Sequence, residues 1–222
     1  WFAGVKYSAV PEPGDLPGPW KDEIVRNCAL NSKAFLVENE NGTVDFVGNR
    51  TECALLLMVR SWGEKYREIR DLEHSNTLQV YGFTSERKMA SVLVKSQDGN
   101  TLRLYNKGAA DWILNRSIAS IDSQGNRVAM GDAERAKLMD VVTEMASRGL
   151  RTLCLAYKDY PASVPGRPAD FFEMPDETEL TAMCIVGIKD PVRKEVPEAV
   201  ATCQRAGIRV RMVTGDNIHT AR

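Results

Sequence analysis

The 222-residue sequence lacks an apolar run long enough to cross a membrane. Its longest such stretch, CALLLMV at residues 53–59, is far shorter than the roughly 20 residues that a bilayer requires. The opening, WFAGVKYSAVPEPGD, has neither the basic start nor the long apolar core of a signal peptide. A net charge of -1 excludes the globally basic surface that attracts nucleic acid. We therefore expect a soluble globular protein.

Cysteine and histidine give no sign of a metal site. The five cysteines are scattered and form no Cys-x-x-Cys pair, which indicates reduced thiols of a cytosolic protein instead of a disulfide framework. His74 and His219 stand apart from each other and from any acidic cluster. The sequence also lacks a P-loop and a glycine-rich dinucleotide fingerprint. Any nucleotide site must therefore be built in another way.

Residues 20–178 predict an α+β domain in which helices flank an antiparallel sheet. The segments TLQVYGF, MASVLVK and TLRLYNK alternate in polarity as strands of a meander do, and an Asn-Gly turn joins two short strands before them. Apolar residues at helical spacing, with capping residues, predict the helices. These cover residues 20–31, 49–62, 108–116 and 131–149, the last with Asp132 as its N-cap.

Residues 179–222 follow a different pattern. LTAMCIVGIKD is a continuous apolar strand, EVPEAVATCQRAG is a helix, and IRVRMVT is another apolar strand. Such a strand–helix–strand unit predicts parallel strands covered on both faces. We therefore predict a linker or cut edge over residues 1–19, the α+β domain over 20–178, and the beginning of a parallel α/β domain over 179–222. Because two strands are too few for such a domain, we expect a piece of a longer protein.

The stretch FTSERKMASVLVK, residues 83–95, places three charged residues between an aromatic side chain and an apolar strand. One interpretation is a solvated edge, with Phe83 as an ordinary core or edge aromatic. The other is that Arg87 and Lys88 face something flat and negatively charged. In that case Phe83 stacks on a purine ring, a contact worth about 1–3 kcal/mol.

Further candidate residues lie at the starts of predicted helices and at one strand end. Lys107 and Gly108 come between a strand and a helix, where a lysine reaches a bound anion and a glycine leaves room for it. Glu52 accepts a hydrogen bond from an adenine amino group, or completes a capping box with Asn49. Arg151 offers its guanidinium fork to phosphate oxygens, or pairs with a carboxylate.

Three residues in the final part lie at the ends of the predicted parallel strands. Asp190 and Asp216 follow these strands, and ligands bind outside the carboxyl ends of strands in open parallel sheets. Gly215 frees the backbone to approach a phosphate, beside the unpaired N–H groups of the next helix. Turn and cap residues at strand ends have the same composition, so both interpretations stay open.

Six motifs in one order resemble a known family. GNRTECALL, FTSERK, YNKGAADWIL, RGLRTLCLAY, GIKDPVRKEVPEAV and RMVTGDNIHTAR together resemble the nucleotide-binding region of P-type cation ATPases. The resemblance extends from about residue 20 to the end of the sequence, and is strongest to the plasma-membrane-type, calmodulin-regulated calcium pumps. Each motif alone is weak, but their combination is highly specific.

The resemblance implies a role for each candidate residue. Glu52 and Phe83 would hold the adenine, with Lys88, Lys107 and Gly108 in the same pocket. Arg151 would reach the phosphates. The segments DPVR and VTGDN would belong to the phosphorylation domain, which is haloacid-dehalogenase-like. Its residues near the terminal phosphate and the Mg²⁺ would be Asp190, Thr214, Gly215 and Asp216.

The function implied is to deliver ATP to an aspartate elsewhere in a calcium-transporting ATPase. The family's phosphorylated aspartate, in DKTGT, is absent, as is the later GDGxND that would supply Mg²⁺ ligands. No catalytic residue is therefore expected in this sequence, and the isolated piece should be inactive. The resemblance also implies ATP with Mg²⁺, a place on the cytosolic face of a plasma membrane or endomembrane, the remaining domains of the pump as partners, and calmodulin through a tail not contained here.

Three other interpretations compete. A free-standing haloacid-dehalogenase-like phosphatase would need a nucleophilic aspartate after its first strand, and none is placed that way. An interaction module would use its sheet and the Pro-rich loop at residues 159–178 without a nucleotide. A sodium/potassium or proton pump is a third alternative, since ion choice resides in membrane helices.

Overall fold

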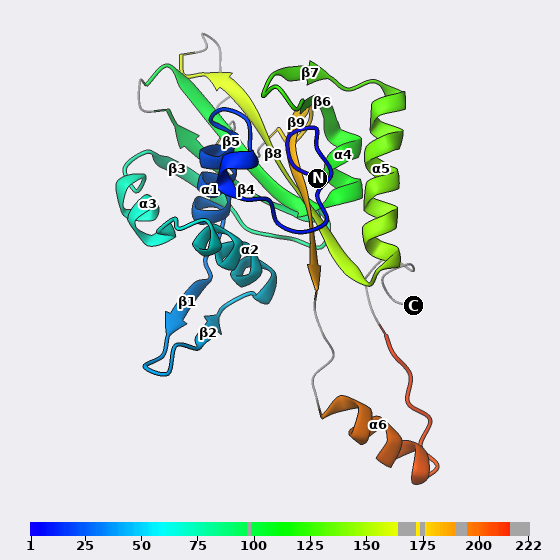
Figure 1. Cartoon of the computed structure of the whole chain (residues 1–222). Helices are drawn as coiled ribbons and strands as arrows, with labels where there is room; N and C mark the ends of the chain where they lie inside the picture. Colours follow the sequence, from blue (N-terminus) through cyan, green and yellow to red (C-terminus); the bar gives the residue numbers. More distant parts are fainter. Residues whose placement is uncertain (97–98, 164–171, 174–175, 190–194, 214–222) are drawn as a thin grey trace.

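A computed structural model of the chain describes residues 1–96, 99–163, 172–173, 176–189 and 195–213. Its centre is a seven-stranded sheet, and the only parallel pair among the described strands is β6 with β9. This confirms the α+β class with an antiparallel sheet (Figure 1). In spatial order, the strands are β3 (Thr77–Tyr81), β4 (Met89–Lys95), β5 (Thr101–Ala109), β8 (Leu150–Pro161), β9 (Leu180–Lys189), β6 (Ser117–Ile121) and β7 (Arg127–Ala129).

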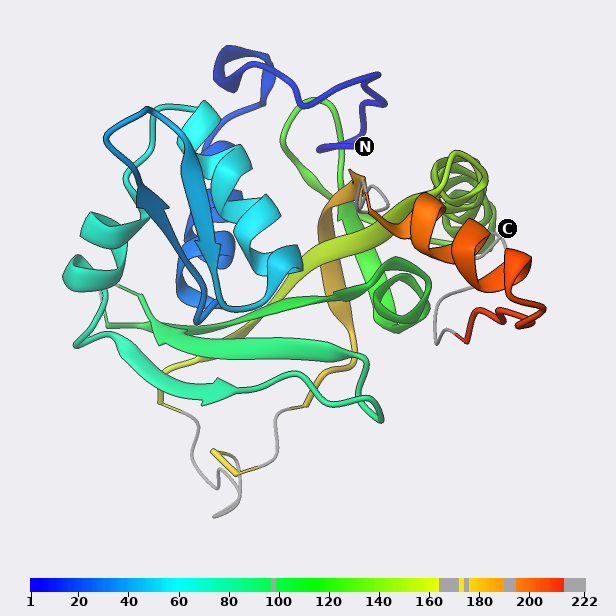
Figure 2. The same cartoon turned by 90° about the horizontal axis from the view of Figure 1, so that it is seen from below.

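Helices α1 (Trp20–Leu30), α2 (Arg50–Ser61) and α3 (Tyr66–Leu72) pack on one face of the sheet. Figure 2 shows them together on one side of β3–β5. Trp20, Ile24 and Cys28 are buried at four-residue spacing, as the sequence predicts for the first helix. Sequence reasoning missed α3, a seven-residue helix that buries only Tyr66 and so has no clear periodicity.

Helices α4 (Ala110–Arg116) and α5 (Asp132–Ser147) cover the opposite face. Leu138, Val142 and Ala146 are the buried residues of α5, one helical turn apart. The expected N-cap, Asp132, is instead the first residue of the helix, and Gly131 takes the cap position without a side-chain bond. The carboxylate of Asp132 therefore lies in the first turn, where negative charge is favourable to the helix dipole.

A small hairpin precedes α2 and confirms the expected Asn-Gly turn. It consists of β1 (Phe35–Glu38) and β2 (Val44–Val47), and Gly42 takes a positive φ of 77° in the turn. Asn49 caps α2 as expected, because its side-chain oxygen accepts from the backbone N–H groups of Thr51 at 2.8 Å and Glu52 at 3.3 Å. The hairpin thereby leads directly into the start of α2.

The strand expected to open a separate parallel unit lies inside the sheet. β9 pairs antiparallel with β8 and parallel with β6, and residues 180–186 are all buried. A strand that is apolar on both faces suits this place because α1–α3 cover one face and α4–α5 the other. The expected helix is α6 (Val196–Arg205), which has no buried residue. Residues 208–213 form no strand and are exposed, with no described strand beside them to supply hydrogen bonds.

The first residues are not a linker. Trp1, Phe2 and Ala3 are buried, and the backbone N–H of Ala3 donates to the carbonyl of Met183 in β9 at 3.0 Å. A short 3₁₀ helix, η1 (Pro13–Asp15), and several Pro-rich turns connect them to α1. Among the described residues, no helix has the length and apolar character that crossing a membrane requires.

Candidate functional site

The ends of three neighbouring strands meet at one edge of the sheet. In the antiparallel register, Met89 at the start of β4 lies opposite Gly108 near the end of β5, and Gly108 lies opposite Cys154 near the start of β8. The candidate residues on these strands and turns, Lys88, Lys107, Gly108 and Arg151, therefore gather at this edge. Strand pairing thus brings together residues as far apart in sequence as Lys88 and Arg151.

Lys107 is buried here, and this excludes the interpretation as an ordinary surface lysine. Only 6% of its side chain is exposed, and its ammonium group donates to the carboxylate oxygen Oε1 of Glu52 at 2.8 Å. The same ammonium group donates to the backbone carbonyl of Asn31, at the end of α1. Since a buried charge needs partners, the pair with Glu52 is what holds a lysine inside the protein at this position.

Glu52 faces this lysine and does not complete a capping box. Its second oxygen, Oε2, accepts from three donors in residues 32–34: a serine hydroxyl at 3.1 Å and two backbone N–H groups at 3.1 and 3.2 Å. Burial alone would raise the pKa of Glu52, but Lys107 and these hydrogen bonds lower it below its ordinary value. Burial in turn lowers the pKa of Lys107, against the opposing effect of Glu52. The ammonium group and the carboxylate, 2.8 Å apart, have the geometry of an ion pair.

Gly108 allows a close approach of protein backbone. A Cβ atom at this position would lie 2.4 Å from the carbonyl oxygen of Lys88 and 2.6 Å from the Cβ of Met89. The same carbonyl accepts from the backbone N–H of Ala109 at 3.1 Å. The glycine is therefore required for the contact between β5 and the residue that precedes β4.

Lys88 has an unusual backbone conformation, with a positive φ of 52°. For a residue other than glycine, this left-handed conformation costs about 1–2 kcal/mol. Its ammonium nitrogen lies 5.2 Å from the ring centroid of Trp112 in α4. The structure therefore places the Lys88 side chain on an aromatic surface and not against the Glu52–Lys107 pair.

Phe83 lies in the turn between β3 and β4 and is 63% exposed. It is therefore not a core residue, and the interpretations as an ordinary exposed edge aromatic and as a stacking surface both stay open. An exposed aromatic ring offers a stacking surface for a planar ligand.

Arg151 reaches the first turn of α2 from the start of β8. Its guanidinium group donates to the hydroxyl of Thr51 at 3.2 Å. The N-terminal turn of α2, the end of β5 and the start of β8 thus supply Thr51, Glu52, Lys107 and Arg151 to one region. Sequence reasoning missed Thr51, although its place next to Glu52 after a capping residue is a readable signal.

Arg87 has a different role from the one that the sequence suggested. Its guanidinium group pairs with the carboxylate of Glu177, with the Nε atom 3.1 Å from Oε2. The interruption of the strand at residues 86–88 is thus explained in part by a protein carboxylate and not by a ligand. The remaining predicted site residues lie outside the described residues: Asp190, Thr214, Gly215 and Asp216.

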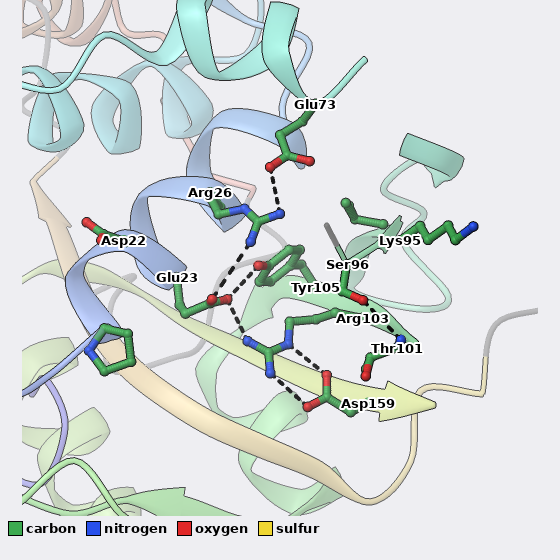
Figure 3. A pocket seen from close by; sticks show the side chains of 12 residues that line it. Asp22, Glu23, Arg26, Glu73, Lys95, Ser96, Thr101, Arg103, Tyr105 and Asp159 are labelled. Atoms are coloured by element: carbon green, nitrogen blue, oxygen red, sulfur yellow. Dashed lines mark hydrogen bonds and ion pairs between the residues drawn. The ribbon is translucent and has the colours of Figure 1, made fainter. Parts of the chain in front are cut away.

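A polar cavity elsewhere in the fold contains none of the candidate residues. It has a volume of about 520 Å³ and lies between α1, the β4–β5 turn and β8 (Figure 3). Its arginines are already neutralised: Arg103 pairs with Asp159 at 2.7 Å and Glu23 at 2.6 Å, and Arg26 pairs with Glu73 at 2.7 Å. We interpret it as a structural ion-pair network. Within the described part of the chain, no group of three or more metal-ligating side chains could hold a metal ion.

The sequence of this α+β domain matches a known class of cytoplasmic domain. Residues 20–195 match the family described as P-type ATPase, cytoplasmic domain N. The chain belongs to this family, which confirms the resemblance seen in its motifs.

Several similar proteins carry the name plasma membrane calcium-transporting ATPase. The chain is 43% identical to plasma membrane calcium-transporting ATPase 1 of Mus musculus and 42% identical to that of Homo sapiens, in each case over 97% of the chain and 18% of the relative. It is 42% identical to plasma membrane calcium-transporting ATPase 4 of Bos taurus, over 100% of the chain and 19% of the relative. The chain thus spans about a fifth of the length of these relatives.

Proposed function

We propose that this chain is the ATP-binding cytosolic domain of a calcium-transporting P-type ATPase. In this role it positions ATP for phosphoryl transfer to an aspartate outside the chain. Membership of the domain N family and 42–43% identity to proteins named as plasma membrane calcium-transporting ATPases support the proposal. The catalytic aspartate lies elsewhere, so the isolated chain should bind a nucleotide without hydrolysing it.

The observation that carries the proposal is the buried Glu52–Lys107 pair, at the end of the sheet where the turn between β3 and β4 carries the exposed Phe83. The proposed roles are that Phe83 stacks on the adenine and Glu52 accepts a hydrogen bond from the adenine amino group. Lys107 keeps Glu52 ionised and so ready to accept. The strained backbone of Lys88 supports a functional role for this edge, because such conformations cluster at ligand sites.

The phosphate end of the nucleotide lies on the other side of this pocket in our proposal. Arg151, at the start of β8, extends toward the phosphates. Asp190, Thr214, Gly215 and Asp216 contribute near the terminal phosphate, where Mg²⁺ bound with the nucleotide neutralises charge. Phosphoryl transfer depends mainly on positioning and on charge neutralisation. The described residues supply the positioning, and we propose that residues 179–222 belong to the phosphorylation domain in function, although β9 lies in the sheet.

The proposal includes the setting of the whole pump. The partners of this domain are then ATP and the remaining domains of the pump, with calmodulin binding to a tail outside the chain. The domain would lie on the cytosolic face of a plasma membrane or an endomembrane. These statements derive from the family resemblance and from the names of the relatives.

Calorimetric titration of the 222-residue chain with AMP and ATP tests the proposal. Phe83→Ala should weaken the binding of both ligands about tenfold, which is about 1.4 kcal/mol and lies within the roughly 1–3 kcal/mol of a stacked base. Phe46→Ala is the matched control, since Phe46 is also exposed, at 40%, but lies on the β1–β2 hairpin. Absence of saturable binding at millimolar nucleotide, or equal effects of the two substitutions, would contradict the proposal.

A further inference from the structure

The turn that carries Phe83 is tied to a distant segment of the chain. Glu177 lies in the segment before β9, and its side chain is only 11% exposed. Its carboxylate accepts two hydrogen bonds from Arg87, one from Nε at 3.1 Å and one from Nη2, and a third from the hydroxyl of Ser91 in β4. A two-pronged arginine–carboxylate pair fixes orientation as well as distance. Ninety positions of sequence separate the two partners, so this contact depends on the folded sheet.

Arg87 transmits this contact to both ends of the turn. Its Nη1 atom donates to the backbone carbonyl of Gly82, the residue before Phe83, at 2.9 Å. Its guanidinium carbon lies 6.0 Å from the ring centroid of Tyr81, the last residue of β3, and Nη2 lies 3.4 Å from the hydroxyl of Ser91. One guanidinium group thereby connects the end of β3, the start of the turn, β4 and Glu177.

Among the described residues, the other contacts of the turn are the bond from the Ala109 N–H to the Lys88 carbonyl at 3.1 Å, the Lys88 ammonium group over Trp112, and two internal hydrogen bonds. Its internal bonds run from the backbone N–H groups of Lys88 and Arg87 to the carbonyl of Thr84 at 2.8 Å and to its hydroxyl at 3.1 Å. Lys88 is in the strained left-handed conformation, and Phe83 is largely exposed. An exposed ring has few packing contacts to orient it, so its position is set mainly by the backbone that carries it.

We propose that Glu177 is a positioning residue for the nucleotide site, acting through Arg87 on the turn at residues 82–88. It holds the backbone so that the Phe83 ring is presented for stacking before a nucleotide arrives, which lowers the ordering cost of binding. The pair also keeps the Arg87 guanidinium on the protein, so that Arg87 is not a phosphate contact. This inference rests on the proposed function and adds Glu177, from the segment before β9, to the residues that shape the nucleotide site.

The first arm of the test needs no nucleotide. Amide hydrogen exchange of residues 84–88 is measured in the chain, in Glu177→Gln and in Glu173→Gln. Glu173 is an exposed carboxylate of the same segment and serves as the matched control. We expect exchange of the Arg87 and Lys88 amides to accelerate at least about tenfold in Glu177→Gln and to stay unchanged in the control.

The second arm measures AMP affinity in a double-mutant cycle with Phe83→Ala. We expect Glu177→Gln to raise the Kd about five- to tenfold alone, but less than about twofold when Phe83 is already alanine, since both changes act through the same ring. A residue with a merely structural role would weaken binding equally in both backgrounds. Thermal unfolding of each variant confirms that it is folded at the assay temperature.

The outcomes separate this inference from the proposed function. Accelerated exchange with a non-additive loss of affinity supports the positioning role. Unchanged exchange overturns it, whatever the affinities are. Accelerated exchange with unchanged AMP affinity also overturns it, and leaves the proposed function standing if Phe83→Ala still weakens binding. If the unmodified chain binds neither AMP nor ATP, the proposed function fails, and the positioning role fails with it.

Discussion

Replacing Glu52 by glutamine should destabilise the chain more than replacing Lys107 by methionine. The two substitutions break the same ion pair, but they leave different groups without partners. In Glu52→Gln, the Lys107 ammonium stays at a position where only 6% of the side chain is exposed, with the Asn31 carbonyl as its remaining strong acceptor. An amide also has one acceptor oxygen, whereas both oxygens of Glu52 accept hydrogen bonds here.

The amide NH₂ of the new glutamine must then face either the ammonium group or the donors at residues 32–34. We expect a cost of about 2–4 kcal/mol, because a buried charge loses its counter-charge and donors oppose one another. In Lys107→Met, Glu52 keeps three hydrogen-bond donors and is 18% exposed. The expected cost is therefore only about 1–2 kcal/mol.

Urea unfolding at neutral pH measures the difference. Each kcal/mol corresponds to a shift of roughly 2–4 °C in Tm for a chain of this size, so thermal unfolding provides a second readout. The double variant should cost less than the sum of the two single changes, because it removes both charges. Glu38→Gln, which breaks an exposed pair with Arg60, should cost less than about 0.5 kcal/mol. An equal or larger loss in Lys107→Met than in Glu52→Gln would refute this reasoning.

Three further predictions concern the same edge and the thiols. Gly108→Ala should cost about 3 kcal/mol or more in urea unfolding, because its Cβ would overlap the Lys88 carbonyl, whereas Gly131→Ala, which meets no atom within 4 Å, should change stability by less than about 1 kcal/mol. Because the pKa of Glu52 is lowered in the folded state, its contribution to stability is present above the ordinary pKa of 4.5 and is lost as the pH falls through the folded-state pKa. The free energy of unfolding, measured between about pH 7 and pH 3, should therefore fall less steeply with decreasing pH in Glu52→Gln than in the unmodified chain. Equal slopes in the two proteins would count against the pair. In a thiol titration of the native chain at about pH 8, Cys203 should react first, because the other cysteines are buried and burial raises the pKa values of Cys28 and Cys154 to about 12. Rapid reaction of all five cysteines would contradict the fold.

The sequence predicted well where a signal is local. The spacing of Trp20, Ile24 and Cys28, the Asn-Gly turn of the hairpin and the cap at Asn49 each depend on a few neighbouring residues, and the structure confirms all of them. The sequence did not predict the seven-residue helix α3, because a single buried residue gives no helical periodicity of apolar positions. The domain division over residues 20–178 and 179–222 remains a prediction.

The strand β9 shows a limit of pattern reasoning. A run that is apolar on both faces indicates burial on both faces, and the sequence cannot tell whether parallel or antiparallel neighbours provide it. Here β8 pairs antiparallel and β6 parallel, and helices from two distant parts of the chain cover the two faces. Only the order of strands in the sheet distinguishes these cases, and that order is not local information.

The adjacent charges of Arg87 and Lys88 illustrate the same limit at the level of side chains. In one of the two interpretations of the sequence, both charges face a single anion. In the fold, the Arg87 guanidinium is paired with Glu177, whereas Lys88 has its ammonium group over Trp112 and its carbonyl against Gly108. Because the arginine is neutralised by the protein, any attraction that this turn exerts on a phosphate must come from Lys88. Arg87→Gln and Lys88→Gln should therefore differ: the first should loosen the turn and weaken AMP and ATP equally, and the second should weaken ATP more than AMP.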